Sequence, residues 1–434
     1  MSLLERSLPE LVKGLCNGSV DLLGYLAELE AHFVAREPAV LAFVPEPGRW
    51  ERVRAEAAAL LAEYPEPEMR PVLFGLPIGV KDIFHVAGMT TRAGSQLPAA
   101  DLQGTEASSV TRLKAAGAIV LGKTVTTEFA YFAPGPTRNP HNPAHTPGGS
   151  SSGSAAAVGA ALVPFAFGTQ TIGSINRPAA YCGVVGYKPS SGRIARDGVI
   201  PLSDSLDHIG YFTRRVSGTS LMAPILCSDW DWTAEDEGKP VLGIPQGPYL
   251  NEAWPEGLAH FQATVEKLQA AGYLVKPVPA MADFPTIRQE HVNLMSAEAA
   301  RFHAPWLTQY RDQYHFKTVA MLEAGEALGD EAIATGQARQ AGLRAELEEL
   351  MAQHEIDFWI APAAQGPAPA GLDATGDPVM NLPWTCSGLP SLTIPTGINN
   401  EGLPLGLQLV GKHGYDEELM VYGQQLDDLL SIHG

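Results

Sequence analysis

The stretch TPGGSSSGSAAAVGAALVPFAFGTQTIGSINRPAAYCGVVGYKP, from Thr146 to Pro189, decides the fold of this chain. It places Gly/Ser turns on either side of an apolar, alanine-rich run at 155–163. A solvated Gly/Ser linker would continue into polar sequence, so this run predicts a helix buried on several sides. The two turns are therefore expected inside the core. There a serine hydroxyl can be aimed at a substrate while water is excluded, as nucleophilic catalysis requires.

Apolar patterns outside this stretch predict one large α/β domain. Residues at helical spacing predict a helical cover over 1–65 and a second helical region over 282–350, polar on one side. No repeat or clear linker divides the 434 residues. We therefore expect a single domain, 1–434, with a twisted mixed β-sheet covered by helices on both faces. Short apolar runs predict several of its strands, including 240–245, 358–362, 392–395 and 402–411.

The composition excludes several classes of partner. The chain carries 29 Lys and Arg against 48 Asp and Glu, a net charge of −19, and has no basic run. We therefore expect no nucleic acid and no anionic membrane as a partner. The opening MSLLERSLPELVKGL has acidic residues where a signal peptide would be basic, and no apolar run reaches the roughly 18 residues of a membrane span.

The cysteines indicate neither a metal site nor a disulfide framework. The four of them lie far apart and form no CxxC pair. This usage favours a reducing cytoplasm. His141 and His145 are four residues apart, but Pro143 between them argues against the helix that would place both on one face. We predict no metal and no cofactor.

One lysine, Lys81, stands directly after the apolar run Ile78-Gly79-Val80. A lysine at the end of a buried strand has two interpretations. Its ammonium group could pair with the neighbouring Asp82. Alternatively, burial could lower its pKa, so that the neutral amine acts as a base.

Two other motifs match known patterns literally. Residues 117–124 fit the phosphate-binding pattern GxxxxGK[ST], but the residues between the glycines are AIVL, which favours a strand over an open phosphate loop. Gly149 to Gly153 fits GxSxG, which would make Ser151 the nucleophile of an esterase-type elbow. The preceding HNPAHTP cannot form the strand that such an elbow must follow. The elbow stays open as an alternative.

The two turns and the lysine together resemble the amidase signature family. The resemblance rests on GLPIGVKD at 75–82, PGGSSSGSAAA at 147–157 and GTQTIGSINRPAAYCGVVGYKPS at 168–190. It is strongest over 70–215 and 355–425, and in this family the region corresponding to 282–350 shapes the substrate entrance. The family uses a Ser–cis-Ser–Lys triad, which falls here on Lys81, Ser150 and Ser174. The two serines are 24 residues apart, the family's spacing.

This resemblance implies a mechanism. Neutral Lys81 would take a proton from Ser150, and Ser150 would take one from Ser174 as that oxygen attacks an amide carbonyl. The peptide bond before Ser150 would be cis. The backbone N–H groups of four residues would form the oxyanion hole, namely Thr171, Ile172, Gly173 and Ser174.

The second turn departs from the commonest form of the family, TDTGGSIR. Gln170 stands where an acid is usual, Ile172 replaces a glycine, and the arginine moves one position along, to Arg177. This form is similar to amidases of the malonamidase type, in which the corresponding arginine meets the substrate's carboxylate. The alternative for Arg177 is a buried salt bridge, with Asp207 as partner. Ile172 indicates a small acyl group.

Trp384 is a further candidate for substrate binding, as a wall of the pocket. It lies in DPVMNLPWT, between two predicted core strands. Core packing is the usual fate of a tryptophan and is the alternative.

Three classes of function follow from these observations. The first is an amidase that hydrolyses a small-molecule amide through a Ser174 acyl-enzyme, with a carboxylate on the substrate as one option. The second is the amidase-fold component of a tRNA-dependent amidotransferase, against which Gln170, the displaced arginine and the acidic charge count. The third is an esterase built on Ser151. The sequence leaves the oligomeric state open, a homodimer included.

Overall fold

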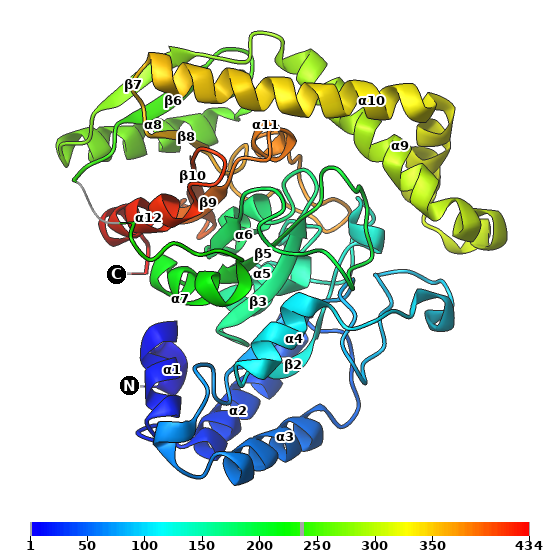
Figure 1. The fold of residues 1–434 in the computed structure, drawn as a ribbon, viewed down its shortest axis with the longest axis vertical. Helices are drawn as coiled ribbons and strands as arrows, with labels where there is room; N and C mark the ends of the chain where they lie inside the picture. Colours follow the sequence, from blue (N-terminus) through cyan, green and yellow to red (C-terminus); the bar gives the residue numbers. More distant parts are fainter. Residues whose placement is uncertain (1, 235–237, 434) are drawn as a thin grey trace.

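A ten-stranded mixed β-sheet forms the centre of the computed structural model, which describes residues 2–234 and 238–433. Helices lie on both faces, as predicted (Figure 1). The strands follow the order β2-β1-β3-β5-β4-β9-β10-β8-β6-β7 across the sheet. Their bounds are β1 Pro77–Lys81, β2 Ile119–Thr124, β3 Phe165–Gln170, β4 Val185–Lys188, β5 His208–Thr213, β6 Leu242–Gln246, β7 Val275–Pro279, β8 Phe358–Pro362, β9 Ser391–Ile398 and β10 Pro404–Val410.

The sheet has parallel ends and an antiparallel middle. Strand β1 pairs in parallel with β2 and β3, and β6 pairs in parallel with β7 and β8. The strands between them pair antiparallel, from β3 through β5, β4, β9 and β10 to β8. The middle of the sheet therefore joins segments that are far apart in sequence, because β4 lies beside β9.

The helices form layers and two end pieces. Figure 1 shows α1 to α3 together at the N-terminal end and the long α9 and α10 crossing the opposite end. These positions match the predicted helical regions over 1–65 and 282–350. The bounds are α1 Leu8–Cys16, α2 Leu22–Val40, α3 Arg49–Glu63, α4 Ser108–Ala115, α5 Ser152–Gly159, α6 Asn176–Cys182, α7 Val216–Leu226, α8 Pro255–Ala270, α9 Phe284–Tyr310, α10 Phe316–Gln353, α11 Leu382–Cys386 and α12 Asp416–Leu430.

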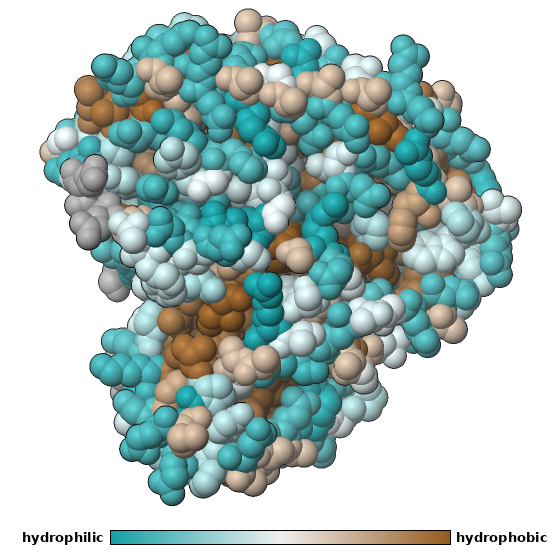
Figure 2. Space-filling view, viewed as in Figure 1, coloured by the Kyte–Doolittle hydropathy of each residue, from teal (hydrophilic) through white to brown (hydrophobic). Residues whose placement is uncertain are grey.

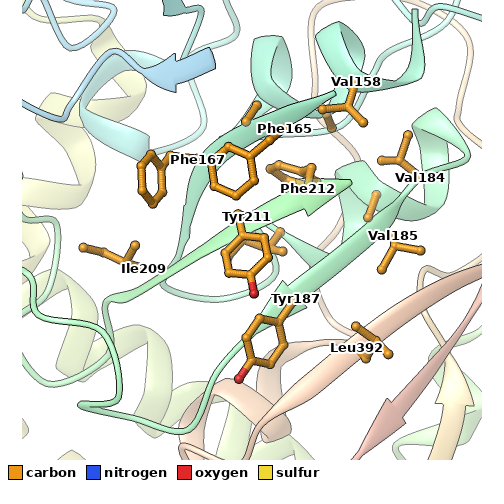
Figure 3. Close-up of a cluster of buried hydrophobic side chains, with 14 of the residues drawn as sticks. Val158, Phe165, Phe167, Val184, Val185, Tyr187, Ile209, Tyr211, Phe212 and Leu392 are labelled. Atoms are coloured by element: carbon orange, nitrogen blue, oxygen red, sulfur yellow. The ribbon is translucent and has the colours of Figure 1, made fainter. Parts of the chain in front are cut away.

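The predicted buried helix is α5, and it packs against the central strands. Every residue from 152 to 158 is buried. Next to it, aromatic rings from three adjacent strands form a continuous row (Figure 3). The ring centroids of Phe165 and Tyr211 lie 5.1 Å apart, and those of Tyr211 and Tyr187 lie 5.3 Å apart. Such pairs stabilise a core beyond the area that they bury, so the turns flanking α5 rest on rigid structure.

A glycine lets α5 approach the chain that it covers. A Cβ atom at Gly153 would lie 2.2 Å from the carbonyl oxygen of Ala42 and 2.4 Å from the backbone nitrogen of Val125. Both are backbone atoms that cannot rotate away. Gly153 is therefore required for the close packing of the start of α5 against the segments at Ala42 and Val125.

The surface is mostly hydrophilic on the face shown in Figure 2, with apolar side chains gathered in a hollow above the N-terminal helices. A pocket between α1 and the start of α7 has Leu8, Leu11 and Val163 in its lining. Among the described residues, no helix combines the length and the apolar character needed to cross a bilayer.

Candidate active site

Lys81 ends strand β1 and is fully buried. Its Nζ lies 2.8 Å from Ser150 Oγ and 2.7 Å from Thr169 Oγ1, so it is held between two hydroxyl groups. The parallel pairing of β1 with β3 brings Thr169 to this position. Burial lowers the pKa of Lys81 to about 7, against an opposing effect of Asp207. At neutral pH a large fraction of this amine is therefore uncharged and able to accept a proton.

The alternative interpretation of Lys81, an ion pair with Asp82, is wrong. Asp82 Oδ1 accepts from Lys123 Nζ at 2.8 Å, and Lys123 lies on the neighbouring strand β2. In the described part of the chain, no carboxylate lies within 4.0 Å of Lys81. A carboxylate partner would stabilise the charged form of Lys81, so its absence keeps the pKa low.

Ser150 and Ser174 line one small pocket. Ser150 follows a cis peptide bond, Gly149–Ser150, and comes two residues before α5. Ser174 comes two residues before α6. Both side chains are buried. The structure thus brings the three predicted triad residues to one place, with Lys81 in contact with Ser150 and with both serines facing the same pocket.

The turn before Ser174 presents unpaired amide groups. Across the residues that the structure describes, the N–H groups of Thr171, Ile172, Gly173 and Ser174 have no acceptor within the protein. A Cβ atom at Gly173 would lie 2.4 Å from Asn381 Oδ1, so only glycine fits there. Four successive unpaired donors beside a serine have the composition of an oxyanion hole.

Comparison with known proteins identifies the family. The sequence model of the amidase family matches residues 48–420. The chain belongs to the amidase family. It is therefore a hydrolase of amide C–N bonds, and its single large α/β domain is the fold of that family.

Two similar curated proteins are each named as a subunit of glutamyl-tRNA(Gln) amidotransferase. The one from Koribacter versatilis (strain Ellin345) is 32% identical over 427 residues, which cover 86% of this chain and 87% of that protein. The one from Exiguobacterium sibiricum is 33% identical over 411 residues, which cover 83% of this chain and 85% of that protein.

Solved structures of amidases superpose closely on this chain. One described as an amidase gives a TM-score of 0.89 at 32% identity, over 98% of this chain and 100% of the other. A peptide amidase in complex with the inhibitor chymostatin gives a TM-score of 0.81 at 27% identity, over 97% of each chain. Hydrolysis of amide bonds is thus supported by sequence and by fold. The similar proteins are named for different substrates, so their names do not identify one for this chain.

Arg177 is almost fully buried and lines the same pocket of the amidase. Its Nη1 donates to the carbonyl oxygen of Gly376 at 2.6 Å, and its Nη2 donates to that of Gly149 at 2.5 Å and to Thr375 Oγ1 at 3.2 Å. Its Nε has no partner among the described residues. Burial lowers the pKa of Arg177 to about 10, which still leaves it charged at neutral pH.

The predicted alternative for Arg177, a salt bridge with Asp207, is wrong. Asp207 instead accepts from Thr171 Oγ1 at 2.5 Å and from the backbone N–H groups of Leu202 and Ser203 at 2.8 and 3.1 Å. Within the described ranges, no carboxylate lies within 4.0 Å of Arg177. Arg177 is therefore a buried cation without a carboxylate in contact in that part of the chain, and Asp377 acts on it only from a longer distance.

Trp384 lies away from this pocket. It is fully buried on α11, its Nε1 donates to Tyr249 Oη at 3.0 Å, and its ring packs edge-on against that of Tyr249. The residues that line the pocket with the two serines do not include it. The structure therefore places Trp384 in the core, the alternative considered for it.

The esterase alternative is wrong. Ser151 is fully buried, does not line the pocket, and directly precedes a helix without following a strand. Its hydroxyl donates to the carbonyl oxygen of Thr169 and accepts from the N–H of Thr169, both at 3.2 Å. This serine ties the first turn to strand β3.

Several residues at the site were not predicted from the sequence. Thr169 contacts Lys81, and its only signal was its position before the second turn. Tyr131, Phe132 and Met295 line the pocket. Met295 belongs to α9, within the region expected to shape the entrance, but no motif marked it.

The low pKa of Lys81 makes the pH dependence of activity testable. Protonated Lys81 cannot accept a proton, so kcat/KM should be low at acidic pH, rise through an ionisation near pH 7 and level off above it. The measurement is a kcat/KM profile from about pH 5 to 9, the window in which a base of this pKa titrates. A flat profile over this window would contradict a role for Lys81 as the base.

A second buried lysine provides the control. Burial also lowers the pKa of Lys188 to about 7, but its Nζ contacts only the carbonyl oxygens of Pro189 and Leu389 within the described chain. The rise in activity should therefore persist in Lys188→Met, whereas Lys81→Met should lose activity at every pH.

Proposed function

We propose that the protein hydrolyses the amide bond of a small molecule to a carboxylate and ammonia or an amine, through an acyl-enzyme on Ser174. The observation that supports this most directly is the contact of Lys81, buried and without a carboxylate partner in the described chain, with Ser150 at 2.8 Å. A serine hydroxyl is a weak nucleophile and needs a base. Lys81 is the base and Ser150 passes the proton.

The proposed reaction moves a proton along these three side chains. Neutral Lys81 takes the proton of Ser150 as Ser150 takes that of Ser174, whose oxygen attacks the amide carbonyl. The same path in reverse protonates the leaving nitrogen, and water then hydrolyses the acyl-enzyme. The unpaired N–H groups of residues 171–174 stabilise the oxyanion. Loss of one such donor costs about 2.7–4 kcal/mol of transition-state stabilisation in enzymes of this kind.

The substrate is a short amide that carries a carboxylate. Arg177 remains charged, has an unpaired Nε and has no carboxylate within 4.0 Å among the described residues. A buried cation is costly unless an anion pairs with it, so a substrate carboxylate would supply the missing charge. Apolar side chains, including Ile172 and Met295, narrow the rest of the pocket and limit the acyl group to a small one. These features agree with the predicted malonamidase-type subgroup.

The second candidate is the catalytic component of a tRNA-dependent amidotransferase. The names of the curated relatives at 30–33% identity favour it. The neutral Gln170, the arginine at 177 and the net charge of −19 count against it. Turnover of a simple amide by the purified chain alone favours the amidase. Activity that needs aminoacyl-tRNA together with a co-purifying protein would favour the amidotransferase.

Covalent labelling tests the nucleophile. A fluorophosphonate should label Ser174, as identified by peptide mass spectrometry, and Ser174→Ala should abolish labelling and lower kcat by about 10⁴- to 10⁶-fold. The matched control is Ser151→Ala, which removes a neighbouring buried hydroxyl outside the pocket and should still be labelled at Ser174. Labelling that survives in Ser174→Ala would refute the proposed acyl-enzyme.

A pair of substrates tests Arg177. Half-amides of short dicarboxylic acids should be turned over faster than uncharged amides of the same length. Arg177→Ala should lower kcat/KM for the half-amide by about 10- to 150-fold more than for the neutral amide, the equivalent of one hydrogen bond to a charged group. Turnover of the uncharged amide measures how far the variant is impaired by losing the hydrogen bond from Arg177 to Gly149, so this effect can be separated from the loss of carboxylate binding. Equal losses on both substrates would show that Arg177 only supports the fold.

A further inference from the structure

Three consecutive carbonyl groups in the turn before Ser174 are each held by a donor. The carbonyl oxygen of Thr171 accepts from His291 Nε2 at 3.0 Å, and that of Ile172 accepts from Thr385 Oγ1 at 2.6 Å. The carbonyl oxygen of Gly173 accepts from the backbone N–H of Arg177 at 3.1 Å. The first two donors come from α9 and α11, far along the chain from the turn that they hold.

Holding a carbonyl group also aims an N–H group. A trans peptide unit is planar, so its C=O and N–H point in opposite directions. The carbonyl of Thr171 belongs to the peptide unit that carries the N–H of Ile172, and the carbonyl of Ile172 to the unit that carries the N–H of Gly173. Each hydrogen bond to one of these carbonyl groups therefore fixes the direction of one unpaired N–H group of the candidate oxyanion hole.

We propose that His291 and Thr385 are positioning residues that orient the oxyanion-hole amides, and that Gln170 in turn orients Thr385. This proposal rests on the proposed function, because the amides matter only if Ser174 attacks the substrate. It extends the machinery beyond the triad and the hole to three side chains that touch no reacting atom.

Gln170 explains why Thr385 donates to the loop. Gln170 Nε2 donates to Thr385 Oγ1 at 2.9 Å and to Asn176 Oδ1 at 2.7 Å. With one lone pair of its hydroxyl engaged, Thr385 directs its single hydrogen to the closer acceptor, the carbonyl of Ile172 at 2.6 Å, rather than to Asn381 at 3.2 Å.

The neutral amide at position 170 is needed for this arrangement. Gln170 Oε1 also accepts from the backbone N–H groups of Ile175 and Asn176, at 2.7 and 2.9 Å. An ionised carboxylate could accept those two bonds but could not donate to Thr385. The glutamine that replaces the family's usual acid thus makes a hydrogen bond to Thr385 that an ionised acid could not donate.

His291 has the features of a dedicated donor. It is buried, and its Nε2 must carry the hydrogen because a carbonyl only accepts. Its Nδ1 is buried with no partner in the described chain. Burial lowers the pKa of His291 to about 4, so the ring stays neutral across the working range. An unpaired buried nitrogen costs about 1–3 kcal/mol, and core packing alone would be served better by an apolar residue.

Paired variants at position 385 test the proposal. Thr385→Val keeps the shape and removes the donor, so kcat should fall by about 10- to 100-fold, less than the 10²- to 10³-fold for loss of a direct oxyanion donor, with KM little changed. Thr385→Ser restores the hydroxyl and should recover most of the loss. The second-order rate of fluorophosphonate labelling at Ser174 should fall in Thr385→Val by a similar factor, because phosphonylation also places an oxyanion in the hole.

Three further variants, at positions 170 and 291, keep the test decisive if Thr385→Val does not fold. Gln170→Glu removes the N–H donors of the side chain while keeping its size. His291→Phe removes the hydrogen bond to the carbonyl oxygen of Thr171. Each variant should lower kcat and leave KM little changed. His291→Gln retains an N–H near the same place and should be less affected. Unchanged kcat in the folded Thr385→Val, Gln170→Glu and His291→Phe proteins, with Ser174 still labelled, would overturn this proposal alone. Loss of Ser174 labelling in the unmodified enzyme would instead overturn the proposed function.

Discussion

The burial of Lys81 without a carboxylate is the constraint on which the site depends. An amine in contact with water, or beside an acid, stays protonated far above neutral pH and cannot serve as a base. Here the surrounding sheet removes the water, and the two nearest polar groups, Ser150 and Thr169, are uncharged hydroxyls. To maintain that environment, the fold must hold α5, the first turn and strand β3 rigidly in place.

The acidic residues near the lysine are engaged elsewhere. Asp82 pairs with Lys123 on the neighbouring strand. Asp207 accepts hydrogen bonds from Thr171 Oγ1 and from two backbone N–H groups, so it ties the oxyanion turn to the segment at 202–203. Burial raises the pKa of both carboxyl groups, while these bonds oppose the effect. These partners keep both carboxylates out of contact with Lys81, although Asp207 still opposes the fall in the pKa of Lys81 from a longer distance.

The fold class, the buried helix and the grouping of the triad could be predicted from the sequence, because local patterns and a family motif need no knowledge of distant contacts. The pairing of Asp82 could not. Asp82 is the first residue after strand β1, where the chain turns, and it meets Lys123 from the neighbouring strand β2, a contact between segments 41 residues apart in sequence. The prediction that Trp384 lines the pocket could not be made reliably, because its position in the sequence does not show toward which side the large ring packs. His291 and Thr385 carried no motif, since each acts through one hydrogen bond to a backbone carbonyl that any donor of suitable reach could make.

The departures from the common family pattern act in one electrostatic direction. A neutral Gln170 removes a negative charge from behind the oxyanion turn, and the arginine, shifted by one position to 177, lines the pocket with no carboxylate within 4.0 Å among the described residues. The amides of 171–174 have no acceptor within the described chain. Each change lowers the energy of negative charge in the pocket. A substrate carboxylate and a developing oxyanion would both benefit. Gln170 and Arg177 together would suit the proposed substrate, whose carboxylate and developing oxyanion would place two negative charges in the pocket.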